Sequence, residues 1–176
     1  CLLTGRVAHQ LEDMANLWSK FLPKYRLFTD ALAESGYHTG FMGKGWSPGN
    51  HKDHGREQNP AGRQYDDFAT FMTTRPAEKP FFFWLGSTHT ALHSFKKADG
   101  TAAGIDMAKI RVPAYLPDRP EVRREIAAYL ATVQQMDAVY GEAIAQLEKA
   151  GELDNTVVIY TSDNGWQMPH GLAHCY

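Results

Sequence analysis

The sequence of 176 residues has only two cysteines, Cys1 and Cys175, one at each end. Two thiols exclude a disulfide framework and a four-thiolate zinc site. No apolar run approaches the ~20 residues that a membrane-spanning helix needs, which predicts no membrane span. The sequence also lacks an excess of positive charge, since 18 Lys and Arg stand against 20 Asp and Glu. This balance argues against a nucleic-acid-binding protein.

The sequence lacks an initiating methionine and a leader. It begins with Cys1-Leu2-Leu3, without the basic segment, apolar segment and small-residue cleavage site of a signal peptide. At the other end, Tyr176 follows a stretch with Gly and His rather than a complete helix or strand. We therefore expect a piece of a longer protein. A content of 43% hydrophobic and 22% charged residues is typical of a globular protein, and the length predicts one domain.

Hydrophobic periodicity predicts alternating helices and strands. Apolar residues at helical spacing indicate a short helix that ends at Gly36 and a long helix over residues 120–150. Apolar runs indicate three strands: residues 37–42, and the buried runs 81–85 and 157–160. A helix followed by a buried strand, repeated, predicts an α/β fold with a mostly parallel sheet and helices on both faces.

The remaining segments have weaker patterns. Residues 10–22 show only a short and weak helical spacing. Residues 47–63 are rich in Gly, Pro, Asn, Asp and His and predict a long loop, as do residues 96–119. Long loops inside a compact domain are often functional.

Polar side chains follow each predicted strand. Lys44 follows the first strand, His89 and His93 the second, and Asp163 and Asn164 the third. Because ligands bind at the carboxyl ends of strands in open parallel sheets, these side chains predict one site. The oxygens of Asp163 and Asn164 suit Ca²⁺ or Mg²⁺, and a lysine with a histidine suits an anionic substrate.

Each of these residues also has a structural interpretation. Asp163-Asn164-Gly165 is a common turn sequence, and Lys44 between two glycines matches a solvated loop lysine. A loop histidine is more often incidental than catalytic, and the chain has eight histidines. The coincidence of suitable residues after three separate strands favours the functional interpretation.

Four segments carry the motifs of one enzyme family in the family's order. They are Cys1–Arg6 with its Leu-Thr-Gly-Arg, residues 36–46, residues 80–89, and residues 156–165 with their Thr-Ser-Asp-Asn-Gly. The chain thereby resembles the type I sulfatases of the alkaline-phosphatase-like superfamily over nearly its whole length. The resemblance implies an alkaline-phosphatase-like core that is incomplete here, with residues 1–176 as part of a sulfatase catalytic domain.

The resemblance also implies an activity, the hydrolysis of sulfate esters of small molecules or carbohydrates. The nucleophile in such enzymes is a formylglycine, made from Cys or Ser by a maturation enzyme, and it is expected upstream of Cys1. Asp163 and Asn164 correspond to ligands of Ca²⁺, which the resemblance favours over Mg²⁺. Lys44 corresponds to a sulfate-binding, catalytic lysine, and His89 or His93 to the proton donor for the leaving alcohol. A periplasmic or secreted location is the family's usual one.

Further residues near these motifs are assigned by position alone. Trp46 is expected to contact the substrate, and the rim of the pocket is expected to include Trp166, Gln167 and His170.

The sequence also departs from the family pattern. Leu3 stands where a proline follows the nucleophile, so Cys1 is not the formylglycine position. Leu92 and Leu172 fall where a catalytic histidine and a sulfate-binding lysine are expected. Two alternatives therefore stay open: a degenerate sulfatase homologue that binds a metal or anion or acts as a scaffold, and a phosphate or phosphonate ester hydrolase of the same superfamily. The 176 residues alone are expected to be inactive.

Overall fold

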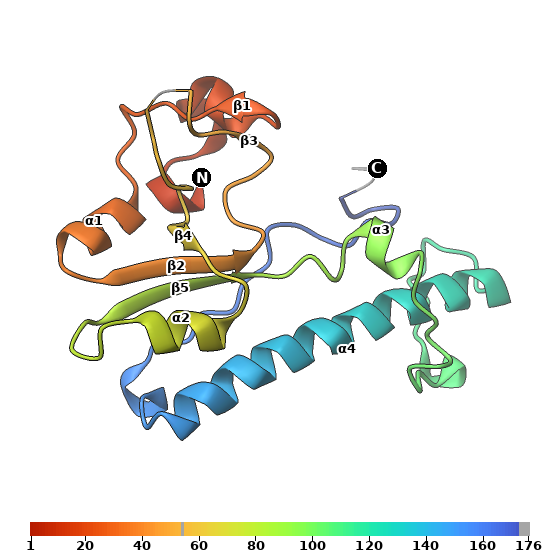
Figure 1. The fold of residues 1–176 in the computed structure, drawn as a ribbon. Coiled ribbons are helices and arrows are strands. Elements are labelled where there is room, and N and C mark those ends of the chain that lie inside the picture. The colour runs from red at the N-terminus through yellow and green to blue at the C-terminus, as the bar shows by residue number, and fades with distance from the viewer. Residues whose placement is uncertain (54, 173–176) are drawn as a thin grey trace. The chain divides into compact units, whose positions relative to one another are not determined.

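The computed structural model describes residues 1–53 and 55–172, which belong to two compact units, Cys1–Ser87 and Thr88–Tyr176 (Figure 1). Five short strands lie in the first unit, and the longest helix, α4, lies in the second. The prediction of one domain over residues 1–176 stays a prediction, because compact units need not be independent domains.

The sheet of the first unit has three parallel strands in the order β4 (Arg63–Gln64), β2 (His38–Gly43) and β5 (Phe81–Gly86). The register places His38 opposite Phe81 and Gly43 opposite Gly86. The predicted strands at residues 37–42 and 81–85 are therefore confirmed, and they are neighbours. The side chains of β5 are half-buried rather than fully buried as predicted.

Helices cover both faces of this sheet (Figure 1). Successive side chains of a strand point to opposite faces. Phe82 packs against Phe28 of α1 (Phe28–Glu34), with ring centroids 5.1 Å apart. On the other face, Phe83 packs against Phe71 of α2 (Phe68–Thr74), with centroids 4.6 Å apart. The predicted α/β architecture and the helix that precedes Gly36 are thus confirmed.

Helix α2 was not expected from the sequence. The Asp67 side chain caps this helix by accepting a hydrogen bond of 2.6 Å from the Thr70 amide, which lowers the pKa of that carboxyl. Phe68 and Phe71, one turn apart, face the sheet. A helix of seven residues is too short to show a helical period clearly.

The weak helical spacing of residues 10–22 corresponds to 3₁₀ turns, Ala8–Gln10 and Glu12–Ala15, and not to an α-helix. A two-stranded parallel sheet follows, formed by β1 (Ser19–Lys20) and β3 (Gly49–Asn50). The apolar side chains of this region form a buried cluster, which contains Leu3, Leu11, Met14, Phe21, Tyr25 and Leu27.

The second unit is built on α4 (Pro120–Lys149), which confirms the predicted long helix. Pro120 occupies its first turn, where a missing N–H costs nothing. The helix buries Ile126 and Ala127 against Phe95 of α3 (Leu92–Phe95). The long segment between α3 and α4 contains a single described 3₁₀ turn, Met107–Lys109.

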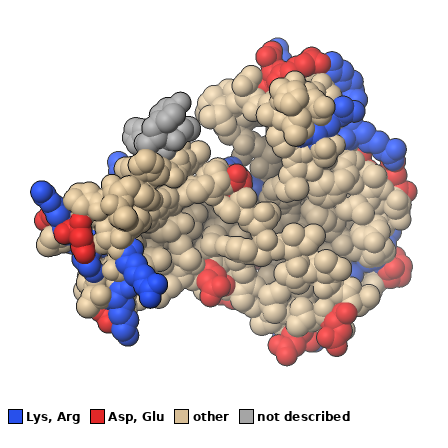
Figure 2. Space-filling model, turned by 180° about the vertical axis from the view of Figure 1, so that it is seen from behind, with Lys and Arg blue, Asp and Glu red and all other residues tan. Residues whose placement is uncertain are grey.

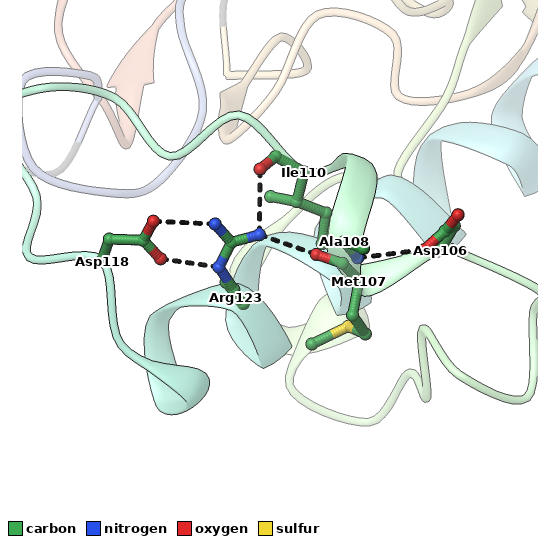
Figure 3. A network of polar contacts seen from close by, with 6 residues as sticks. All are labelled: Asp106, Met107, Ala108, Ile110, Asp118 and Arg123. Carbon is green, nitrogen blue, oxygen red and sulfur yellow. Dashed lines mark hydrogen bonds and ion pairs between the residues drawn. The ribbon is translucent and has the colours of Figure 1, made fainter.

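Arg123 of α4 fixes this segment to the helix (Figure 3). Its guanidinium makes two hydrogen bonds, of 2.6 and 2.7 Å, to the Asp118 carboxylate, and it lowers the pKa of that carboxyl. One of its nitrogens also donates to the carbonyls of Met107 and Ile110, at 2.7 and 3.1 Å. A forked donor of this kind ties two places in the segment to α4: the 3₁₀ turn with its C-cap Ile110, and Asp118.

The predicted strand at residues 157–160 is wrong for this structure. The segment has no regular secondary structure and belongs to no sheet, and Val157 and Ile159 are 86% and 81% exposed. A strand exists only through hydrogen bonds to a neighbouring strand, and the described part of the second unit contains none. The apolar run is present, but its pairing partner is not.

Two further properties of the described residues are the hydrophobicity of the helices and the distribution of surface charge. No helix in the described residues has both the length and the hydrophobicity to cross a membrane. On the face in Figure 2, basic and acidic side chains are interspersed, and uncharged residues form most of the surface. This face therefore offers no broad basic surface to an anionic substrate (Figure 2).

Candidate functional site

Lys44 lies at the carboxyl edge of the three-stranded sheet, directly after β2. Its amide donates a 2.7 Å hydrogen bond to the carbonyl of Gly86, the last residue of β5. The two strand ends approach so closely that a Cβ at Gly86 would overlap the Lys44 backbone. Lys44, which is exposed, and Ser87, which is half-buried and follows β5, therefore share one edge of the sheet. The role of Lys44 in sulfate binding stays a prediction.

The backbone of Trp46 is held by Asn59, which was not among the residues expected from the sequence. The Trp46 amide donates to Asn59 Oδ1 at 3.0 Å, and Asn59 Nδ2 donates back to the Trp46 carbonyl at 2.9 Å. The half-buried indole packs edge-on against Phe21, with centroids 5.9 Å apart. Asn59 thus orders the backbone two residues after Lys44. The role of Asn59 depends on a contact between residues 13 positions apart, so no local sequence pattern predicts it.

His38 has a shifted pKa, but it lies at the opposite end of β2. Its Nε2 is 3.0 Å from the Tyr65 hydroxyl, and its ring stacks on Phe71 with centroids 5.0 Å apart. Burial lowers the pKa of His38, and the nearby cations Lys79, Arg63 and Arg75 lower it further. His38 therefore lies away from the predicted site, and its contacts join β2 to Tyr65 and to α2.

His89 and His93 lie in the second unit, before and within α3. His93 is exposed, and His89 is half-buried. The Ser94 hydroxyl donates to the Thr88 carbonyl at 3.1 Å and so holds the chain around His89 in a compact turn. Leu92, at the position expected for a catalytic histidine, packs against the apolar cluster of the second unit.

Asp163 and Asn164 are exposed on the segment that follows residues 157–160. The Ser162 hydroxyl donates to the Asn164 carbonyl at 2.6 Å. The next residues, 166–172, form a closed loop: the Leu172 amide donates to the Trp166 carbonyl at 2.8 Å. The side-chain oxygen of Gln167 in this loop accepts a hydrogen bond from the Leu92 amide. The structure thereby joins the loop after Asn164 to α3, which carries His93.

The oxygens of Asp163 and Asn164 fit a calcium ion in donor type. In proteins Ca²⁺ takes about 6–8 oxygen ligands. No group of three or more His, Cys, Asp or Glu side chains within residues 1–53 and 55–172 could share a metal ion. The described residues therefore contain no complete metal site of this kind, and calcium binding by Asp163 and Asn164 stays a prediction.

The predicted site residues divide between the two units. Lys44 and Trp46 belong to the first unit, and the four others, His89, His93, Asp163 and Asn164, belong to the second. Within each unit, the structure links candidates through the backbone: Lys44 to Gly86, and the loop after Asn164 to α3.

The chain is similar to known sulfatases. The family model described as Sulfatase matches residues 62–175. A human protein, N-sulphoglucosamine sulphohydrolase, is 38% identical over 78 residues, which are 44% of this chain and 16% of that protein. N-acetylglucosamine-6-O-sulfatase of Bacteroides thetaiotaomicron is 55% identical over 44 residues, 24% of this chain and 8% of that protein.

A third relative is the ulvan-active sulfatase of Formosa agariphila, 33% identical over 61 residues. That match covers 35% of this chain and 10% of the relative. The chain therefore aligns with less than a fifth of the length of each of these three proteins.

Proposed function

Because this chain belongs to the sulfatase family, we propose that the protein containing it hydrolyses sulfate esters of carbohydrates. The family match over residues 62–175 carries the proposal, since it includes β5 and both candidate calcium ligands, Asp163 and Asn164. Two of the three relatives are named for sulfated glucosamine derivatives and the third for ulvan, which supports a carbohydrate substrate.

Each candidate residue has a distinct task in this proposal. The Lys44 ammonium binds the sulfate oxygens at the edge where β2 and β5 end. Trp46, held by Asn59, lies two residues away and contacts the alcohol portion of the ester. His89 or His93 donates a proton to the ester oxygen as the S–O bond breaks, so that the alcohol leaves neutral.

The proposal includes two groups beyond the described side chains. A formylglycine upstream of Cys1 would supply the nucleophile, and Ca²⁺, in preference to Mg²⁺, would neutralise charge on the sulfate. Asp163 and Asn164 would hold the ion, with further oxygen ligands from outside these 176 residues. A formylglycine-generating or equivalent maturation enzyme is the implied partner, and a periplasmic or secreted location is part of the same proposal.

The test is sulfate release by the protein that contains this chain, produced together with its maturation enzyme. We expect turnover of an aryl sulfate and of sulfated glucosamine. The Lys44→Ala variant should reduce kcat/KM by about 10²–10³, as the loss of one group that stabilises developing charge does. Lys52→Ala is the matched control, because Lys52 is also an exposed loop lysine but lies in the 47–63 loop.

Other outcomes would contradict the proposal. Turnover of an aryl phosphate in place of the sulfate would favour the phosphate or phosphonate hydrolase. Absence of turnover despite bound calcium would favour the degenerate homologue. Sulfate release by the purified 176-residue chain would contradict the expectation that this chain alone is inactive.

One observation specifically supports the degenerate homologue as the second candidate. Leu92 packs against the apolar cluster that contains Phe95 and Ile126, so its side chain serves the core. In that case proton donation falls to His93 or His89 or is absent. Replacing His93 and His89 by Gln, one at a time, distinguishes these possibilities. The histidine whose replacement abolishes turnover of substrates with poor leaving groups is the proton donor, and loss in neither variant indicates that no histidine donor is present.

A further inference from the structure

The loop over residues 166–172 has a fixed shape. It is closed by the hydrogen bond from the Leu172 amide to the Trp166 carbonyl and by a second bond, of 3.0 Å, from the Gly171 amide to the Met168 carbonyl. Met168 is buried in the apolar cluster of the second unit. A Cβ at Gly171 would overlap Trp166, so only glycine fits there.

This closed loop presents His170 in a strained backbone conformation. His170 has a φ of 58°, in the left-handed region that residues with a Cβ rarely adopt. Its ring lies against Tyr115, with centroids 4.5 Å apart and ring planes inclined at 57°. Both side chains are nevertheless exposed, and Tyr115 is 47% exposed. Backbone strain of this kind clusters at functional sites.

Asp163, Asn164 and His170 lie on one segment that runs along α4, and the His170–Tyr115 pair is the part of it nearest the N-terminus of the helix. Tyr160 contacts Tyr140, and Trp166 contacts Tyr129, so the segment advances toward the N-terminus of α4. Beyond Trp166 the chain reaches His170, which contacts Tyr115. Tyr115 precedes the first residue of α4 by five positions.

An exposed pair of aromatic rings with polar groups matches the chemistry of a sugar ring. The ring faces offer apolar surface to the C–H groups of a pyranose, while the Tyr115 hydroxyl and the imidazole offer hydrogen bonds to its hydroxyls. Because both rings stay exposed, much of their apolar surface remains available to a ligand. Neither group has a task in the chemical step proposed above.

We propose that His170 and Tyr115 form a subsite for a neighbouring sugar ring of an oligosaccharide substrate, next to the ring that carries the sulfate. The inference rests on the proposed function. It identifies the substrate as a sulfated disaccharide or longer chain rather than a monosaccharide. Binding at such a distance from the reacting group adds affinity without taking part in bond cleavage.

The experiment compares a sulfated disaccharide with the corresponding sulfated monosaccharide, using the full protein. For Tyr115→Ala we expect KM for the disaccharide to rise about tenfold with kcat nearly unchanged, the loss of one good aromatic contact. KM for the monosaccharide should stay as in the wild type. His170→Gly should have the same effect without loss of folding, because glycine accepts a φ of 58°.

Tyr37→Ala is the matched control, since Tyr37 is an exposed tyrosine next to the amino end of β2, away from the edge that carries Lys44. If Tyr115→Ala changes KM equally for the disaccharide and the monosaccharide, or changes neither value, the proposed subsite is wrong. A second measurement separates this result from the proposed function: binding of the unsulfated disaccharide, followed by NMR of the His170 ring. Binding that Tyr115→Ala abolishes supports the subsite even if no sulfate is released, and no binding by the wild type refutes it.

Discussion

His38 illustrates how a single residue couples folding to pH. Burial and the cations around it lower its pKa in the folded chain, whereas an unfolded chain leaves the imidazole at its ordinary value. The unfolded state therefore binds a proton first as the pH falls. The contribution of neutral His38 to stability is present above its unfolded pKa of about 6.5, and it is lost as the pH falls through the lower folded value.

We predict that His38→Gln reduces the loss of thermal stability between pH 7.5 and pH 5. Glutamine does not titrate, so the difference between the wild-type and variant melting temperatures isolates His38. His51, whose pKa is also lowered by burial, is present in both proteins and cancels. Melting curves followed by circular dichroism provide the measurement. An identical pH dependence in the two proteins would show that His38 does not titrate as the structure indicates.

At the same scale, single residues divide into those that local sequence identifies and those it does not. Lys44 could be placed from the sequence, because an apolar run ended by glycine marks the end of a strand. Asn59 and Tyr115 could not, because their contacts join residues far apart in the chain. His170 was expected at the rim of the pocket, but its contact with Tyr115 was not. The sequence shows that Leu92 occupies the position expected for a catalytic histidine, and the structure shows that its side chain packs against the apolar cluster of the second unit.

At the scale of elements, length and pairing decided what the sequence could predict. The 30 residues of α4 repeat their apolar period many times, whereas the seven residues of α2 do not. The strands β2 and β5 follow from their apolar runs and pair with each other. The run 157–160 has an equally strong pattern, but pairing is a property of two segments and cannot be deduced from one.

The packing of α4 yields a second prediction at this scale. Gly100 is buried against the helix backbone at Ala127, and a Cβ there would overlap it. Gly100→Ala should therefore lower the free energy of unfolding by about 1–3 kcal/mol, the usual cost of overpacking. Gly141→Ala is the control: Gly141 lies within α4 with no atom near its Cβ position. That variant should gain about 0.5–1 kcal/mol from helix propensity.

Urea denaturation of both variants measures these changes in the free energy of unfolding. Equal stability of the Gly100→Ala variant and the wild type would mean that the segment before α4 can move away from the helix.

At the scale of the whole molecule, the family assignment and the architecture agree. The matched residues 62–175 extend across both compact units, and the parallel sheet with helices on each face is the predicted α/β core. The order of motifs along the chain was enough to predict this much. Substrate contacts and the complete metal site were not predictable, because the chain aligns with under a fifth of each relative.

The exposed segment Val157–Tyr160 has a consequence for how this chain behaves in concentrated solution. Four uncharged, β-prone residues without proline, 56–86% exposed, form a template for cross-β stacking between molecules. We predict that light scattering by the 176-residue chain rises with concentration, and that Ile159→Lys suppresses the rise because the added charge repels incoming strands. Leu17→Lys, at an equally exposed leucine outside any such run, should leave the rise unchanged. The same four residues that indicate a strand within a sheet therefore make the isolated chain prone to fibrillar self-association.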